Sequence, residues 1–292
     1  MSDYLITTDN TTDFPEEFLA SQDVPEMFLN YILDGTTYDE NNNMAFSDFY
    51  AKMREGKLPT TSQVTPERAK EYFRKFLEKK KRILHIAFSS GLSGTYASAC
   101  LAAQDLMEEQ PDCQITVVDS LSASMGEGLL VYKALELQKQ GMGYDELIAW
   151  LEKYKNNVCH NFTVDDLFHL YRGGRVSKAA AVIGTMINLK PVLHVDDAGC
   201  LKPLAKVRGR KKSLHALVDD MERQIGSWRD KNDIVFISHG DCYEDAVYVS
   251  ELVKKRFGIE KFLIGTIGPT IGAHSGPGTV ALFYMGDNRK PQ

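Results

Sequence analysis

The sequence lacks the short motifs by which proteins commonly hold nucleotides, metals and disulfide bonds. It contains neither a GxxxxGK[ST] phosphate-binding loop nor a GxGxxG dinucleotide fingerprint. Its five cysteines are dispersed without CxxC or CxH spacing, which argues against a zinc site or a disulfide framework and predicts reduced, buried thiols. We therefore expect a protein that carries no metal and no cofactor.

Long hydrophobic runs and a surplus of basic residues are also missing. No apolar run approaches the roughly 20 residues of a transmembrane helix. The opening Met-Ser-Asp-Tyr has neither the basic nor the apolar region of a secretion signal. A net charge of −6 argues against nucleic acid as the main partner, and the one dense basic cluster is Arg208-Gly-Arg-Lys-Lys212. We expect a cytoplasmic protein with no transmembrane segment and no nucleic-acid partner.

The first half of the chain alternates strand and helix signals. Thr65-Pro66-Glu67 is a strong helix start, with a capping threonine, proline at the first helical position and an acid in the first turn. Units of this size predict a three-layer α/β/α domain, residues 1–157, around a parallel sheet. We expect strands at 4–8, 83–88 and 114–119, strand material at 24–33, and helices at 46–54, 66–81, 93–110, 122–140 and 144–156.

The pattern changes after about Val158. The turn Asp196-Asp-Ala-Gly199 separates two apolar runs and predicts a hairpin. Hairpins combined with crossovers predict a smaller α/β domain with a mixed sheet, residues 158–292. We expect its strands at 161–164, 191–195, 200–207 and 233–238, with two more near the end, and its helices at 211–228 and 243–257.

The most informative segment is the loop after the strand at 83–88. It is rich in hydroxyls and glycines and leads directly into a helix, so backbone N–H groups and the positive end of a helix dipole point at one place. We interpret it as an anion site, although an ordinary turn capped by serine has the same pattern. Its hydroxyl residues are Ser89, Ser90, Ser93 and Thr95, and its glycines are Gly91 and Gly94.

Three other segments hold candidate binding residues. Thr60, Thr61 and Ser62 precede a helix that Thr65 already caps, so capping does not explain them. Gly268–Gly278 contains four glycines and two prolines and predicts a shaped loop that presents His274, either for function or simply as an exposed histidine.

Arg172 and Arg175 flank a glycine pair between two helical segments. They could bind a carboxylate or phosphate or an acidic partner, or be solvated residues beside a helix end. The small residues that follow could line a channel or allow close helix packing; they are Ala179, Ala180, Ala181 and Gly184.

Taken together, these segments resemble the DegV family over essentially the whole chain. The resemblance rests on the motifs Ile6–Pro15, Thr61–Pro66, Ser89–Thr95, Leu170–Arg175 with Ile187–Val192, and Gly272–Gly278. Asn10 stands where that family's first motif leads us to expect serine, a difference that affects capping more than binding.

The resemblance implies a two-domain α/β protein that buries the tail of one long-chain fatty acid. Similar proteins are the fatty-acid-binding subunit of a bacterial fatty acid kinase. They present the carboxylate to a separate ATP-using kinase subunit, which forms the acyl phosphate for phospholipid synthesis. This implies a carrier without catalysis of its own, whose only bound small molecule is the fatty acid.

The resemblance also implies roles for particular residues. The head group would be held by Ser93 with Thr61 or Ser62, with His274 nearby, and Gly94 and Gly272 would complete this site. Arg172 and Arg175 would contact the kinase subunit or the head group.

Two alternatives remain open from the sequence. Gly91-Leu-Ser-Gly-Thr95 is one residue short of the GxSxG nucleophile elbow, which allows an esterase or thioesterase with Ser93 as nucleophile and His274 as base. A small-molecule phosphotransfer subunit is the other alternative, because the implied fold resembles that of dihydroxyacetone kinases.

Overall fold

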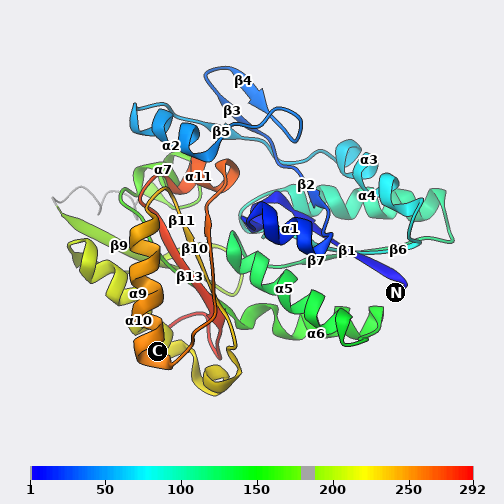
Figure 1. The fold of residues 1–292 in the computed structure, drawn as a ribbon. Coiled ribbons are helices and arrows are strands. Elements are labelled where there is room, and N and C mark those ends of the chain that lie inside the picture. Colours follow the sequence, from blue (N-terminus) through cyan, green and yellow to red (C-terminus); the bar gives the residue numbers. More distant parts are fainter. Residues whose placement is uncertain (1, 179–187, 292) are drawn as a thin grey trace.

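The computed structural model describes residues 2–178 and 188–291, which form two large sheets, a small third sheet and the helices packed on them (Figure 1). The sequence interpretation of Ala179, Ala180, Ala181 and Gly184 falls outside the described residues. The described residues include no helix that is long and apolar enough to cross a membrane. Cys113 and Cys159 are buried, and the other three cysteines are half-buried free thiols.

The first sheet is parallel throughout, as the sequence predicts. Its strand order is β2-β1-β6-β7, and both neighbours of β1 pair with it in the parallel direction. The strands are β1 (Tyr4–Asp9), β2 (Glu26–Met27), β6 (Arg82–Ala87) and β7 (Gln114–Asp119). Their carboxyl ends therefore meet at one edge, where ligands of open α/β sheets usually bind.

Helices cover both faces of this sheet. Successive side chains of β6 point to opposite faces, so Ile83 packs under α3 and α4 while Leu84 packs under α5. The two faces are covered by α3 (Pro66–Leu77) with α4 (Thr95–Glu109), and by α5 (Met125–Lys139) with α6 (Tyr144–Tyr154). Near the α5 face lies α1 (Glu16–Gln22), whose Phe18 joins the same core.

The second sheet is mixed, which confirms the fold class. Its order is β10-β9-β8-β13-β11-β12; β11 and β12 are parallel and the other neighbours are antiparallel. The strands are β8 (Val158–Thr163), β9 (Leu189–Val195), β10 (Leu201–Arg208), β11 (Val235–His239), β12 (Phe262–Thr266) and β13 (Val280–Met285). Strands before residue 157 and after it thus belong to different sheets.

The two large sheets share a middle layer. The outer face of the mixed sheet is covered by α9 (Arg210–Gln224) and α10 (Tyr243–Phe257), while its inner face packs on α5. One hydrophobic core consequently runs from Leu84 of the parallel sheet through Leu130 of α5 to Phe283 of the mixed sheet.

A small antiparallel sheet, of which the sequence predicted only strand material at 24–33, lies above α7 (Phe168–Arg172) and α11 (Pro269–Ser275) in Figure 1. Its strands are β3 (Tyr31–Leu33), β4 (Thr36–Tyr38) and β5 (Thr60–Thr61), and it packs with α2 (Phe46–Arg54) around Tyr31, Phe49 and Tyr50. The two threonines of β5 have no hydrophobic alternation that would indicate a strand.

The segment 268–278 is not the shaped loop that the sequence predicts. Residues Pro269–Ser275 form α11, which begins with proline at its first position and ends before Gly276, whose φ is 77°. Gly268, Gly276 and Gly278 therefore flank a short helix, Gly272 lies within it, and His274 lies in its last turn.

Other differences concern the ends of elements. The helix expected to reach Lys81 ends at Leu77, and the one expected to reach Trp228 ends at Gln224 and is followed by a 3₁₀ segment, Gly226–Lys231. A 3₁₀ turn, Asn10–Thr12, follows β1, and another such turn, Lys155–Asn157, follows α6.

Candidate ligand-binding site

A cavity of about 250 Å³ lies between the carboxyl end of the parallel sheet and the inner face of the mixed sheet. The loop after β6 and the start of α5 form one side, and α11 forms another. Most of the lining is apolar. Its apolar residues are Leu29, Phe88, Leu92, Ala123, Phe162, Leu170, Val195, Leu201, Ile267, Ile271, Ala281 and Phe283.

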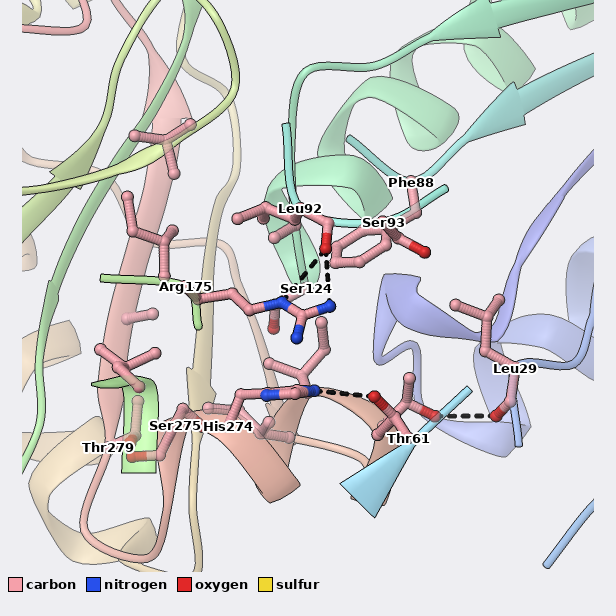
Figure 2. A pocket seen from close by; sticks show the side chains of 18 of the residues that line it. Leu29, Thr61, Phe88, Leu92, Ser93, Ser124, Arg175, His274, Ser275 and Thr279 are labelled. Atoms are coloured by element: carbon pink, nitrogen blue, oxygen red, sulfur yellow. Dashed lines mark hydrogen bonds between the residues drawn. The ribbon is translucent and has the colours of Figure 1, made fainter. Parts of the chain in front are cut away.

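Polar groups from distant segments meet at this cavity. Of the residues expected at the site, the lining includes Thr61, Ser62, Ser93, Gly94, Arg175 and His274. Figure 2 shows Arg175 and His274 extending toward the Ser93 and Thr61 segments. The structure thus brings together six of the eight site residues that were predicted from the sequence.

Ser93 is held by hydrogen bonds within its own loop. Its backbone N–H donates to Ser89 O at 3.1 Å, and its Oγ accepts from Thr95 N at 3.2 Å. Ser89 is fully buried, and its Oγ donates to Gly199 O in the turn between β9 and β10. Ser89 is therefore an anchor between the sheets, while Ser93 reaches the cavity.

Gly94 allows the Ser93 and Thr61 segments to pack closely. A methyl group at Gly94 would clash with the side-chain amide of Gln63, which also lines the cavity and would have to move. The neighbouring Val64 N donates to Thr95 Oγ1 at 3.2 Å. The two hydroxyl-rich segments consequently form one continuous wall.

His274 completes this wall as a neutral imidazole. Its Nε2 lies 2.8 Å from Thr61 Oγ1, while its Nδ1 is buried and has no hydrogen-bond partner within residues 2–178 and 188–291. Burial, supported by the positive charges of Arg175 and Arg172, lowers the pKa of His274 to about 3. Near pH 7 the ring therefore carries one N–H and no charge.

Arg175 supplies positive charge beside the neutral donors. Its Nε and Nη2 donate to Leu92 O at 3.1 and 2.8 Å, and its Nη1 donates to Gly173 O. Burial lowers the pKa of Arg175, and no carboxylate among the described residues raises it. Since a guanidinium has five N–H donors, two remain for an anion in the cavity.

The structure does not bring Arg172 and Gly272 to the cavity wall. Arg172 Nη2 donates to Pro59 O at 2.8 Å and to Ala273 O at 3.0 Å, so it ties the β5 segment to the end of α11. Gly272 faces α2, and a methyl group there would lie 2.6 Å from the hydroxyl oxygen of Tyr50. Because Gly272 has no side chain, α11 can pack closely on α2.

Several residues that line the cavity are not among the site residues predicted from the sequence. Ser124, Thr270 and Ser275 carry hydroxyls into the lining; Thr270 and Ser275 belong to the segment 268–278, of which only His274 and Gly272 were predicted as site residues, and no motif marks Ser124. His160, on β8, is not among the residues predicted from the sequence to form the site. Phe162, two residues further along the same strand, also lines the cavity. Because side chains alternate along a strand, this spacing places His160 on the same face.

A group of buried carboxyls lies behind the cavity. Glu127 accepts hydrogen bonds from Thr8 at 3.1 Å and Thr11 at 2.8 Å, and burial raises its pKa well above the ordinary value. Burial also raises the pKa of Asp13 to about 8 and that of Glu26 to about 7. In the described ranges, no group of histidine, cysteine and carboxyl residues is arranged to hold a metal ion.

The arrangement differs from that of a serine hydrolase. In the part of the chain that the structure describes, no hydrogen bond joins Ser93 to His274; Ser93 bonds to Thr95, and His274 bonds to Thr61. A nucleophile needs a base within hydrogen-bond reach. The geometry instead favours binding of an anion with an apolar tail.

Comparisons with known proteins agree with this geometry. Residues 4–287 match the model of the DegV family, described as uncharacterised proteins. The chain is 42% identical to a DegV domain-containing protein of Clostridium perfringens, over the full length of both.

Among solved structures, the chain resembles a fatty-acid-binding DegV family protein of Thermus thermophilus, with a TM-score of 0.85, 30% identity and coverage of 97% of this chain and 99% of that one. It also resembles a DegV family protein of Ruminococcus gnavus with vaccenic acid, with a TM-score of 0.86, 26% identity and coverage of 97% and 100%.

Proposed function

The chain belongs to the DegV family, and from this premise we propose that it binds one long-chain fatty acid. The acyl tail would occupy the apolar part of the cavity, and the carboxylate would face Thr61, Ser93, Arg175 and His274. The observation that carries the proposal is the meeting of these donors at one wall of a largely apolar cavity.

The energetics of such a ligand suit this cavity. Burial of a methylene gains about 0.8 kcal/mol, so a tail of fourteen methylenes offers roughly 11 kcal/mol before costs. An unpaired carboxylate would lose much of this gain on burial. Hydroxyl, imidazole and guanidinium donors offset that loss, so the tail provides affinity and the polar wall provides placement.

The relatives support the same ligand class. The Thermus thermophilus protein is described by its fatty-acid binding, and the Ruminococcus gnavus protein is described with vaccenic acid. We extend this ligand class to the present chain because its cavity offers both an apolar space and anion donors.

We further propose that the chain is a carrier that presents the carboxylate to a separate, ATP-using fatty acid kinase subunit. Acyl phosphate formation, in the cytoplasm and for phospholipid synthesis, would follow. Two observations support this: the sequence has no phosphate-binding loop, and among the described residues Ser93 has no hydrogen bond to a base. The chain can thus hold the fatty acid that is to be activated, but it has no nucleotide-binding motif of its own.

Mass spectrometry of lipid extracted from the denatured, purified protein tests the binding proposal. We expect one fatty acid to co-purify, and added palmitic acid to raise the melting temperature of the delipidated protein. Absence of both bound lipid and a melting shift would contradict fatty-acid binding.

A second experiment tests the carrier role. The loaded protein, a fatty acid kinase subunit from a DegV-containing bacterium and ATP should together form acyl phosphate, trapped as a hydroxamate, whereas neither protein alone should. Labelling of Ser93 by a fluorophosphonate probe would instead support the hydrolase.

A further inference from the structure

The short helix α11 determines where much of the cavity wall lies. Within its seven residues, Thr270, Ile271, His274 and Ser275 all line the cavity. The residue before its first position is Gly268, which has no side chain to cap the helix. The helix therefore depends on other segments for its placement.

Asp13 provides the missing contact at the start of α11. Its Oδ1 accepts a hydrogen bond from Gly268 N at 2.8 Å, and its Oδ2 shares one with Ser124 Oγ at the start of α5. Ser124 Oγ lies 2.9 Å from Ser238 Oγ on β11. A single carboxyl, 6% exposed, thus links α11 to α5 and, through Ser124, to the mixed sheet.

The fit around Asp13 is close. A methyl group at Gly268 would lie 3.0 Å from Asp13 Oδ1, and one at Gly265 would lie 3.2 Å from Asp13 O. The backbone of Asp13 is left-handed, with φ at 54°, which turns the chain toward this contact. At the opposite end of α11, Arg172 donates to Ala273 O, so both ends of the helix are fixed.

We propose that Asp13 is a positioning residue of the carboxylate site, which holds α11 so that His274 meets Thr61 and faces the ligand. This inference rests on the proposed fatty-acid binding, and it assigns a role in that site to a residue that does not line the cavity. Asp13 acts through the helix, because His274 Nε2 must lie within hydrogen-bond distance of Thr61 Oγ1 to complete the polar wall.

Replacements at Asp13 separate this role from simple burial. In Asp13→Asn, the amide oxygen can still accept from Gly268 N and the amide nitrogen can donate to Ser124 Oγ. In Asp13→Ala, both contacts are lost. A matched control is Asp23→Ala, because Asp23 has a similar left-handed backbone, with φ at 51°, but is exposed at the end of α1.

The test compares palmitic acid with hexadecanol, each displacing a fluorescent fatty acid from the delipidated protein. We expect Asp13→Ala to weaken palmitic acid binding about tenfold, the scale of one hydrogen bond to a charged group, and hexadecanol binding less than twofold. Asp13→Asn and Asp23→Ala should keep the wild-type preference for the acid. In a His274→Ala background, Asp13→Ala should have no further effect on this preference.

Equal weakening of acid and alcohol by Asp13→Ala, or full additivity with His274→Ala, would overturn the inference. If Asp13→Ala does not fold, Gly268→Ala replaces it, because its methyl group would lie 3.0 Å from Asp13 Oδ1 and make the carboxyl shift without removing a buried group. That variant should also lower the preference for the acid, and an unchanged preference would count against the inference.

A readout without lipid separates this inference from the proposed function. The ring ¹H–¹⁵N signals of His274, identified by their absence in His274→Gln, should move in Asp13→Ala and stay in place in Asp13→Asn. Moved signals in a protein that binds no fatty acid would contradict the proposed function alone. Unmoved signals would contradict the positioning role.

Discussion

Thr61 Oγ1 and His274 Nε2 lie 2.8 Å apart although 213 positions separate them in the chain. Thr61 belongs to the small sheet and His274 to α11, so this contact joins two segments of which the sequence predicted neither as a regular element. The polar wall of the cavity depends on this pairing, and the predictions that follow concern the groups around it.

Ser93→Ala should weaken fatty-acid binding by about 1–2 kcal/mol, because it removes a hydroxyl donor from the carboxylate site. Displacement of a fluorescent fatty acid measures the change. Ser90→Ala is the matched control, since Ser90 lies in the same loop but is exposed and outside the cavity lining. Unchanged affinity in Ser93→Ala would remove Ser93 from the site.

His274 should remain neutral from pH 5 to pH 8 in the lipid-free protein. Its pKa of about 3 lies below the ordinary value because burial and the nearby arginines disfavour the charged ring. An NMR titration of the His274 ring should therefore show no inflection in this range. A midpoint near the ordinary histidine value would show that the ring is more hydrated than the geometry indicates.

The free energy of unfolding should fall as pH rises from 7 to 9. Asp13, with a pKa of about 8, and Glu127, with its raised pKa, hold protons in the folded state that the unfolded chain has released. Their stabilising contributions are therefore complete at low pH and are lost as pH rises through the folded-state pKa values. Each carboxyl contributes a slope of about 1.4 kcal/mol per pH unit while only the folded state binds its proton.

Urea unfolding at several pH values measures this slope. Asp13→Asn should reduce it, because the amide does not titrate. Exposed Asp23→Asn should leave it unchanged. A stability that rises between pH 7 and pH 9 would contradict protonated buried carboxyls.

Arg175→Gln should weaken palmitic acid binding at least tenfold and leave hexadecanol binding nearly unchanged, because the guanidinium supplies the positive charge at the cavity. Arg172→Ala should weaken palmitic acid binding less than Arg175→Gln does, since Arg172 does not line the cavity and acts only by tying the β5 segment to the end of α11, and it should slow acyl phosphate formation with the kinase subunit more than it weakens binding. Competition binding and hydroxamate trapping measure the two effects. Equal loss of binding and turnover in Arg172→Ala would place this residue at the head group.

Local signals in the sequence predicted much of the fold. Thr65 does cap α3, accepting from Arg68 N at 3.4 Å, and the strand Gln114–Asp119 and the helix Tyr243–Phe257 have the predicted bounds. These elements have strong periodicity or strong end signals, so local chemistry suffices to define them. The two-residue strand Thr60–Thr61 exists only because Tyr31 and Ile32 pair with it, and a local pattern cannot show such a partner.

The sequence indicated which kinds of residue form the candidate site, but not how they are arranged in space. Hydroxyls, glycines and His274 marked segments that line the cavity in the structure, and the family resemblance grouped them. Which residues face the cavity depends on packing between distant elements: Gly272 turns to Tyr50, and Arg172 to the carbonyl of Ala273. Asp13 lies within the motif Ile6–Pro15, but no local pattern can show its contact with Gly268, which spans 255 positions.

The middle helix α5 makes the two halves of the chain thermodynamically inseparable. Leu130 and its neighbours are covered on one side by the parallel sheet and on the other by the mixed sheet. A chain cut after residue 157 would leave one face of α5 open to water in one fragment and the inner face of the mixed sheet open in the other. Each fragment would then expose apolar surface that promotes aggregation, so the intact chain should melt in a single cooperative transition.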